Sequence, residues 1–191
     1  MAENNSWVLD CVADSSRVIG ELSGQLERIS AICEMVTSSL LSGKKLLTAG
    51  NGGSAAAALH LAEELTGRYS RNDRRALPAI CLAADGTALT CIANDWDFAS
   101  VFSRQVEALA QSGDVLVVFS SSGNSENLIR ACKIMRKRGG KTIGVLGKGG
   151  GKNLAHCDQV LVINSQRCAA IQEAHDVVLH LILEYVEKYA N

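Results

Sequence analysis

One stretch decides the fold of this chain, residues 48–54, which read Thr48-Ala49-Gly50-Asn51-Gly52-Gly53-Ser54. A short apolar run, 45–47, comes before it, and an alanine-rich segment with helical character follows it. Glycines let a backbone turn sharply and come close to a ligand. The first N–H groups of a helix have no partner inside the helix and favour negative charge. The order of strand, glycine turn and helix therefore predicts an anion pocket at residues 50–54.

Composition limits the fold and the partners. The chain has 191 residues, which favours a single domain over 1–191 with a substantial core. Hydrophobic residues make up 47% and aromatic residues only 4%, a balance that suits an α/β protein with closely packed helices. The formal net charge of −1 gives no reason to expect a nucleic acid or a membrane as partner.

The seven cysteines favour reduced thiols. Their number is odd and no C-x-x-C pair occurs, which argues against a disulfide framework and against a zinc–thiolate site. The N-terminus lacks a positively charged start to an apolar stretch, and no apolar run reaches the roughly 20 residues that span a bilayer. We expect a soluble, cytoplasmic protein.

Strands and helices alternate along most of the chain. Apolar runs predict five strands, at 45–49, 79–83, 115–119, 142–146 and 158–163. Helical patterns occupy the segments between and after them, at 54–66, 88–94, 99–111, 125–138 and 169–189. This alternation predicts a parallel sheet with helices on both faces, in which ligands bind beyond the carboxyl ends of the strands. A loop is expected at 147–151.

The N-terminal segment has apolar residues at helical intervals from about residue 6 to residue 42. It predicts either one long helix or two helices broken near Gly20–Gly24. This segment, 1–42, is expected to pack against a second subunit and so to serve oligomerisation, although packing on its own sheet is the alternative.

A second polar loop follows the strand at 115–119 and reads Ser120-Ser121-Ser122-Gly123-Asn124-Ser125. Its hydroxyl and N–H groups are numerous donors for the oxygens of a phosphate. The alternative is a solvated turn in which Ser125 caps the following helix. Neither loop contains a Walker sequence or the G-x-G-x-x-G pattern of dinucleotide-binding proteins.

Candidate catalytic and metal-binding side chains lie on two of the predicted helices. His60 and Glu64 are four residues apart and share one helix face, whereas Glu63 lies about 100° away. The pair suits a divalent metal, an acid–base pair or a plain solvated contact. The last helix carries Gln172 and His180, but their separation of about 12 Å along the axis does not by itself make them partners.

Together these residues resemble the phosphoheptose isomerases of the sugar isomerase (SIS) domain superfamily. The resemblance runs in register from about residue 40 to the C-terminus. It is carried by Gly50–Ser54, His60-x-x-Glu63-Glu64-Leu65-Thr66-Gly67-Arg68-Tyr69, Asn94-Asp95, Ser120–Ser125, Ile171-Gln172-Glu173-x-His175 and His180.

The resemblance implies a three-layer α/β sandwich with a five-stranded parallel sheet in flavodoxin-like order, preceded by the N-terminal helical extension. It implies a homotetramer with active sites between subunits and one Zn²⁺ per subunit, held by His60, Glu64, Gln172 and His180. It also implies substrate contacts, to which we add Ser54 and Arg68 from the same motifs: Asn51, Gly52, Gly53, Ser54, Glu64, Arg68, Asn94, Asp95, Ser120, Ser121, Ser122, Ser125 and Gln172.

The implied reaction interconverts sedoheptulose 7-phosphate and glycero-manno-heptose 7-phosphate, which differ by a proton shifted between C1 and C2. Glu64 is the candidate base and His180 its acid–base partner, while zinc polarises the carbonyl. Whether Glu64 serves as base, as ligand or as both stays open. The chain departs from its relatives at 55–58, where they often carry an Asp, and at Ala169 and Ala170, where a polar residue and an Arg are common.

Two other functions are compatible with the same fold. Some relatives are non-catalytic proteins that bind a replication initiator or sense sugar phosphates, and an enzyme of this kind can act on a different ketose phosphate. Retention of all four residues of the implied metal set favours the enzyme.

Overall fold

The strands of this protein form one five-stranded sheet in which all pairings are parallel. The computed structural model describes residues 5–190, and the strand order is β2-β1-β3-β4-β5. The strands are β1 (Leu46–Gly50), β2 (Ala79–Cys81), β3 (Val115–Ser120), β4 (Lys141–Leu146) and β5 (Gln159–Val162). The parallel sheet and its flavodoxin-like order, both predicted from the sequence, are confirmed.

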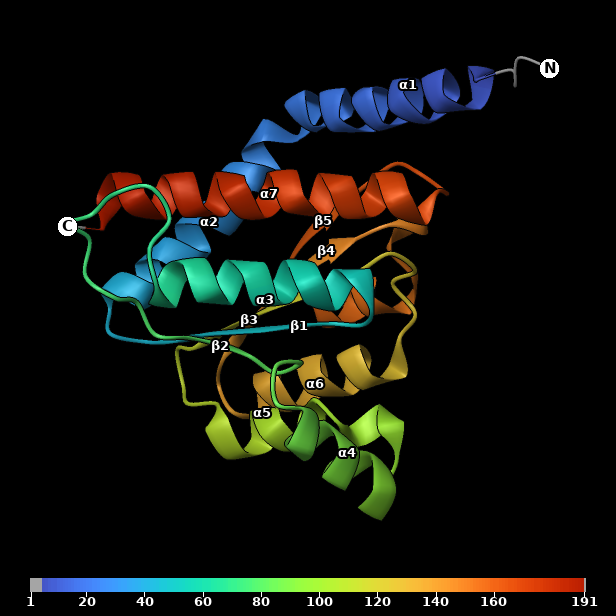
Figure 1. Ribbon diagram of the computed structural model, residues 1–191. Coiled ribbons are helices and arrows are strands. Elements are labelled where there is room, and N and C mark those ends of the chain that lie inside the picture. Colours follow the sequence, from blue (N-terminus) through green and yellow to red (C-terminus); the bar gives the residue numbers. More distant parts are fainter. Residues whose placement is uncertain (1–4, 191) are drawn as a thin grey trace.

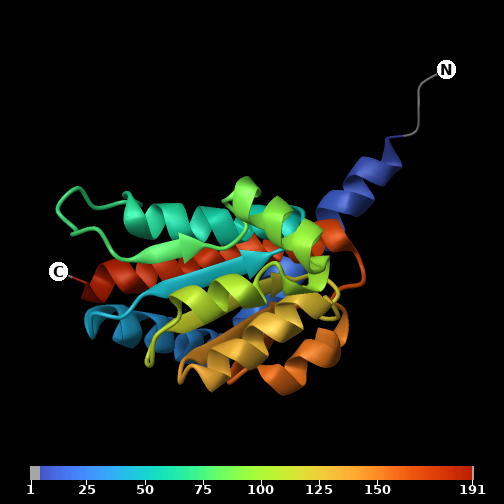
Figure 2. The same ribbon diagram turned by 90° about the horizontal axis from the view of Figure 1, so that it is seen from below.

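Helices cover both faces of the sheet and make a three-layer sandwich (Figures 1 and 2). One face carries α2 (Leu26–Leu41), α3 (Gly53–Thr66) and α7 (Cys168–Tyr189). The other carries α4 (Gly86–Asp95), α5 (Ser103–Leu109) and α6 (Glu126–Lys137). The layered architecture is therefore the one expected from the alternation of strands and helices.

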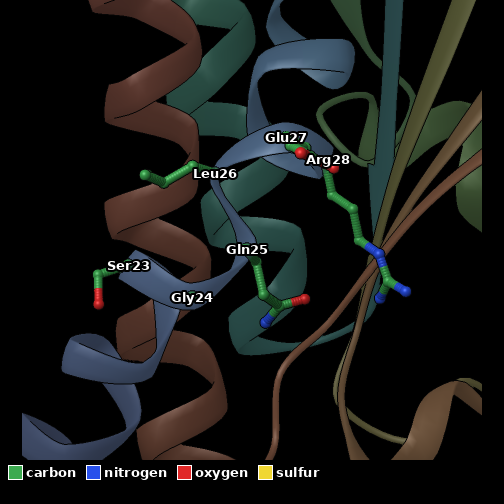
Figure 3. A pocket seen from close by; sticks show the side chains of 6 residues that line it. All are labelled: Ser23, Gly24, Gln25, Leu26, Glu27 and Arg28. Atoms are coloured by element: carbon green, nitrogen blue, oxygen red, sulfur yellow. The ribbon is translucent and has the colours of Figure 1, made fainter.

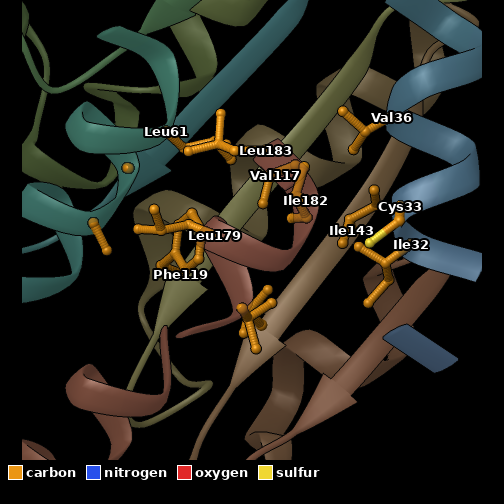
Figure 4. Packing of buried hydrophobic residues seen from close by; sticks show 14 of the residues in the cluster. Ile32, Cys33, Val36, Leu61, Val117, Phe119, Ile143, Leu179, Ile182 and Leu183 are labelled. Atoms are coloured by element: carbon orange, nitrogen blue, oxygen red, sulfur yellow. The ribbon is translucent and has the colours of Figure 1, made fainter. Parts of the chain in front are cut away.

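The central strand β3 shows why the sheet is buried on both sides. All six of its residues are buried. Val117 and Phe119 point into the core beneath α2, α3 and α7, whereas Leu116 and Val118 point into the core beneath α4, α5 and α6. Figure 4 shows how the first of these cores joins side chains of α2, α3 and α7 to β3 and β4. A continuous apolar run is typical of a parallel strand covered on both faces.

The N-terminal segment forms two helices, α1 (Ser6–Gly20) and α2, joined by a 3₁₀ turn, η1 (Glu21–Gln25). The break lies where the glycines predicted it. Helix α2 buries Ile32 and Val36 against its own sheet. Helix α1 instead contacts α7 and extends away from the body of the molecule (Figures 1 and 2), leaving Trp7 and Leu9 exposed, at 65% and 72%.

Two local predictions are wrong. The helix expected at 99–111 is split into a short 3₁₀ turn, η2 (Phe98–Ser100), and α5, which begins only at Ser103. The loop expected at 147–151 is the start of a longer irregular 3₁₀ segment, η3 (Lys148–His156). Three successive glycines in η3 have positive φ angles, a conformation that leaves no helical or strand periodicity in the sequence.

All seven cysteines are free thiols, as expected. Among residues 5–190, no helix combines the length and the apolar character needed to cross a bilayer.

The winding of the chain places a ligand site beyond two particular strands. From β1 the chain moves outward to β2 on one side and then returns to β3 on the other side of β1. The loops that leave β1 and β3 therefore diverge, and they open a crevice between them at the carboxyl edge of the sheet. These two loops are the glycine turn, residues 50–54, and the serine loop, residues 120–125.

Candidate functional site

The glycine turn and the serine loop meet directly beyond the sheet. The side-chain amide of Asn51 donates to Oδ1 of Asn127 at 3.0 Å, and that of Asn127 donates to Oδ1 of Asn51 at 2.9 Å. This reciprocal pair ties the loop after β1 to the first turn of α6. Between the loops lies a small cavity of about 40 Å³, lined by Asn51, Ser54, Phe119, Ser120, Ser121, Ser122 and Ser125.

The hydroxyls of the serine loop are only partly used within the protein. Ser120 Oγ accepts a hydrogen bond from the Gly123 N–H at 3.0 Å, and Ser122 Oγ accepts one from Asn124 at 3.1 Å. Ser125 occupies the N-cap position of α6 but makes no capping hydrogen bond with its side chain. The alternative interpretation of Ser125 as a helix cap is therefore not what the structure shows, and its hydroxyl lines the cavity.

A second cluster lies farther along α3, at its contact with α7. His60 Nε2 lies 3.4 Å from Glu64 Oε1, and ligand atoms of His60, Glu63 and Glu64 lie within 4.8 Å of one another. The ring of His180 on α7 meets the ring of His60 edge-on, with 5.1 Å between centroids. Two segments 120 residues apart in the sequence thus bring imidazoles and carboxylates together.

Tyr69 holds His180 from the other side. The two rings stack with 5.9 Å between centroids, and the Tyr69 hydroxyl donates to Glu184 Oε1 at 3.1 Å. Because Glu184 lies one turn after His180 on α7, this contact joins the loop after α3 to the helix that carries the imidazole. Tyr69 thereby restricts the orientation of the His180 ring.

Gln172 lies apart from this cluster, against the glycine turn. A Cβ built on Gly53 would lie 2.6 Å from the amide atoms of Gln172, so the amide occupies the space that a side chain at 53 would need. Gln172 and His180 are about 12 Å apart along α7. The structure therefore groups His60, Glu64 and His180 and places the fourth predicted ligand beside Gly53, at the start of α3.

A buried ion pair lies at the C-terminal end of α3. The Arg74 guanidinium lies 3.3 Å from Glu187 Oε1, with side chains only 1% and 7% exposed. The same guanidinium donates to the carbonyl oxygens of Glu64 and Leu65, and Glu187 accepts from the backbone N–H groups of Ser70 and Arg71. This Arg74–Glu187 clamp fixes the end of α3 and the loop that follows it to α7.

Three predicted substrate contacts do not join either cluster within this chain. Arg68 is exposed and donates to Asn72 in its own loop, beyond the opposite end of α3 from the serine cavity. Asn94 and Asp95 are exposed at the end of α4, where the Asn94 amide donates to Asp95 at 2.9 Å. In the described chain these three residues make no hydrogen bond or ion pair with the serine loop, His60, Glu64 or His180.

Three of the six positions at which the chain departs from its relatives are buried. Ala57, Ala58 and Ala170 belong to the core, at no more than 3% exposure. His175 is also part of the core: it is fully buried, packs at 5.4 Å from the ring of Phe119 and has no hydrogen-bond partner on either ring nitrogen. His175 is therefore a residue of the core and not of the candidate site.

No local pattern in the sequence marks Asn127, the contact between Tyr69 and Glu184 or the Arg74–Glu187 clamp. Each is a long-range pairing, and an isolated Asn or Glu in a helix has no local pattern that marks it. The position of Asn127 in the first turn after the serine loop is the one feature that could have suggested it.

His60, Glu64 and His180, which we call the His–Glu cluster, have the donor set of a metal site. Imidazole nitrogen and carboxylate oxygen are ordinary zinc ligands, and His60, Glu64 and His180 present both types from two helices. A much larger open hollow, about 690 Å³, lies beside the turn between α1 and α2. Figure 3 shows that one stretch of six successive residues lines it, Ser23–Arg28, without a histidine or a cluster of acids. It is not a candidate for the same chemistry.

The comparisons with known proteins agree with this geometry. The chain matches the SIS domain family over residues 12–147. It is 51% identical to a phosphoheptose isomerase of Campylobacter concisus over 167 residues, which cover 87% of this chain and 86% of that protein.

Two solved structures are similar over nearly their whole length. A phosphoheptose isomerase from Neisseria gonorrhoeae has a TM-score of 0.90 at 38% identity, covering 96% of this chain and 98% of that one. A phosphoheptose isomerase from Francisella tularensis has a TM-score of 0.84 at 29% identity, covering 95% and 98%. With the fold, the serine cavity and the His–Glu cluster in place, the chain belongs to the SIS domain family and, within it, to the phosphoheptose isomerases.

Proposed function

We propose that the protein interconverts sedoheptulose 7-phosphate and D-glycero-D-manno-heptose 7-phosphate, as a cytoplasmic step in the synthesis of heptose precursors of the lipopolysaccharide type. The observation that carries the proposal is the placement of the His–Glu cluster and the serine cavity along one helix, α3. The relatives named phosphoheptose isomerase support the same reaction.

The separation of the two clusters suits a long sugar phosphate. Gly53 and His60 are seven residues apart on α3, which is about 10 Å along the axis. An open-chain heptose with a terminal phosphate has a comparable length. The phosphate on C7 would lie in the serine cavity while C1 and C2 reach the His–Glu cluster, so that binding at the remote end orients the reacting carbons.

The phosphate end is built from neutral donors. Ser120, Ser121, Ser122 and Ser125 present hydroxyls, and the turn at Asn51–Ser54 presents N–H groups at the start of α3, where the helix dipole favours an anion. Gln172, beside Gly53, is placed to donate to or accept from a hydroxyl of the sugar chain.

The proton transfer is assigned to Glu64 and His180. Glu64 is half-buried beside His60 and would take the proton from C1 of the ketose, or from C2 of the aldose, and return it to the neighbouring carbon. His180, oriented by Tyr69, would donate to and accept from the two sugar oxygens as the enediolate forms and collapses.

His60, Glu64 and His180 would hold one Zn²⁺ per subunit, with Gln172 reaching toward the ion by a change of side-chain conformation. A bound zinc ion polarises a carbonyl and stabilises the negative charge of an enediolate. Glu64 would serve either as a ligand of the ion or as the base that moves the proton.

The assembly is proposed to be a homotetramer with active sites between subunits. Arg68, Asn94 and Asp95, which do not reach the clusters of their own chain, are exposed and free to contribute to the site of a neighbour.

The test is conversion of sedoheptulose 7-phosphate by the purified protein, before and after treatment with a chelator and after zinc is restored. We expect turnover that the chelator abolishes and zinc restores. Glu64→Gln should lower kcat by at least about 100-fold without a change in thermal unfolding, because it removes the base. Glu173→Gln, an exposed carboxylate on α7, is the matched control. Absence of turnover in the zinc-loaded wild type would reject the proposed reaction, and near-normal Glu64→Gln activity would reject the role of Glu64.

A further inference from the structure

The serine cavity, as described, has no positive charge among its lining residues. A sugar phosphate carries close to two negative charges at neutral pH. Hydroxyls and N–H groups stabilise such an anion, but a nearby cation adds the stronger, charge-assisted hydrogen bonds. A basic side chain close to the cavity would therefore strengthen its binding of phosphate.

The segment that begins η3 lies directly against the serine loop. The Gly147 N–H donates to the Ser120 carbonyl at 2.9 Å, and the Asn153 N–H donates to the Gly123 carbonyl at 2.9 Å. A Cβ built on Gly147 would lie 2.5 Å from Cδ1 of Ile171 and 2.6 Å from the Ser121 carbonyl oxygen, so only glycine allows this close approach to the serine loop. Lys148 is the next residue after this contact.

The backbone at Lys148 is unusual. Its φ angle is +48°, and in residues 5–190 it is the one non-glycine residue with a positive φ. The next three residues are glycines that adopt positive φ angles without steric cost. A lysine held in this conformation, where glycine would fit better, points to a use for its side chain.

The side chain of Lys148 has no carboxylate partner in the described chain, although eleven ion pairs are formed elsewhere. It lies instead beside the thiol of Cys168, the first residue of α7. The Ser121 hydroxyl and the Lys148 ammonium both lower the pKa of that thiol. Since Ser121 lines the cavity and the Gly147 backbone is bonded to the same loop, Lys148 is the basic residue placed beside the cavity.

We infer that Lys148 is the cation that binds the phosphate group of the substrate, from the rim formed by Ser121 and Cys168. The inference rests on the proposed function, and it adds a charged binding residue to a site otherwise made of neutral donors. Lys148 contacts the phosphate and not the reacting carbons, so it acts on substrate affinity.

The test compares three variants of Lys148 with a matched lysine of the same segment. Lys148→Met and Lys148→Gly remove the charge, and Lys148→Arg keeps it. Lys152→Met is the control, because Lys152 is an exposed lysine of η3 that contacts neither Ser121 nor Cys168. Two quantities are measured: the KM for sedoheptulose 7-phosphate and the dissociation constant of inorganic phosphate.

We expect Lys148→Met and Lys148→Gly to raise both quantities by about 10- to 100-fold, with a smaller change in kcat, because a charge-assisted hydrogen bond is lost. Lys148→Arg should keep most of the affinity, and Lys152→Met should change neither quantity. Lys148→Gly separates charge from folding: because glycine fits the positive φ, this variant should unfold at an equal or higher temperature while its phosphate binding weakens.

A third measurement follows the reactivity of the Cys168 thiol, which lies beside Lys148. Alkylation of Cys168 by iodoacetamide, located by peptide mass spectrometry, should be slower in Lys148→Met at neutral pH, since less of the thiol is ionised. Inorganic phosphate should slow alkylation in the wild type by occupying the rim, and it should have little further effect in Lys148→Met.

Unchanged phosphate binding and KM in Lys148→Met and Lys148→Gly would overturn the inference and leave the proposed reaction standing. An equal loss in Lys152→Met would also overturn it, because a general effect of charge would then explain the data. If the wild type binds phosphate but does not convert the heptose, the proposed reaction fails while the phosphate measurements still decide the role of Lys148. If the wild type does neither, both fail.

Discussion

His175 is a titratable residue in a place where charge is costly. It is fully buried on α7 without a well-formed hydrogen bond, and burial lowers its pKa from 6.5 to about 4. The unfolded chain therefore binds a proton at this site between pH 6.5 and 4, whereas the folded protein does not. In that window the free energy of unfolding falls as the pH falls, and the loss levels off below pH 4.

The size of this effect gives a prediction. Lowering the pKa of His175 from 6.5 to about 4 corresponds, as an order of magnitude, to about 3 kcal/mol in the free energy of unfolding. Urea unfolding of the wild type and of His175→Leu from pH 7 to pH 4 should show that the wild type loses about this much more stability than the variant. Parallel curves for the two proteins would show that His175 is not buried in its neutral form.

Single residues also show what a sequence can and cannot indicate. The pair His60 and Glu64 has a spacing that places both on one helix face, and the structure has them in contact at 3.4 Å. Gln172 could be proposed only from family resemblance, since no spacing rule links it to the cluster. Lys148 could not be identified, because a lysine among glycines has the same sequence in a solvated loop as in a binding site.

At the scale of elements, the contact between α3 and α7 depends on the Arg74–Glu187 clamp. Removing one member of a buried ion pair leaves a desolvated charge without compensation, which costs about 3–5 kcal/mol. Arg74→Met should lower the free energy of unfolding by this amount. It should also loosen the end of α3, because the carbonyls of Glu64 and Leu65 lose their donor.

An exposed arginine provides the comparison. Arg17 pairs with Asp14 and Glu21 on α1, but its side chain is 49% exposed. Arg17→Met should change stability far less than Arg74→Met does, because solvent screens such pairs. Urea unfolding of both variants, with the same probe and buffer, decides the matter: similar losses for Arg74→Met and Arg17→Met would mean that the clamp does not hold the two helices together.

Elements with a clear apolar period were predictable. The five strands and the helices α3, α6 and α7 were expected within a few residues of their bounds, because burial on a sheet imposes a pattern. The segment 99–111 shows the limit: its apolar residues are compatible with one helix, but the structure has a break at 101–102, close to the contact of Asp97 with Arg130 on α6. That contact joins residues 33 positions apart and leaves no local sign.

At the scale of the whole molecule, α1 is the element least explained by the single chain. Trp7, Leu9 and Val12 are at least 59% exposed on it. Exposed apolar side chains gathered on one helix mark an interaction surface. In the proposed tetramer this surface packs against another subunit.

Light scattering at several protein concentrations tests this role of α1. The wild type should have the mass of a tetramer, and Trp7→Ser combined with Leu9→Ser should shift it to smaller species, because polar side chains remove the apolar contact. Leu109→Ser, which changes an exposed leucine of α5, should leave the mass unchanged. An unaltered tetramer in the double variant would place the subunit contacts elsewhere.

The overall architecture was accessible from sequence because it depends on many residues that each repeat one pattern. The candidate site depends on a few residues whose positions are set by that architecture. The resemblance to relatives supplied the members of the His–Glu cluster, and the fold supplied the neighbours, such as Asn127 and Tyr69, that hold them in place.

The close approach of Gly53 to Gln172 has a consequence for how this protein can change over generations. Any larger residue at 53 needs the volume that the amide of Gln172 now fills, so the end of the Gln172 side chain would have to move aside. A substitution at 53 would therefore displace a predicted metal ligand that lies 119 residues farther along the chain.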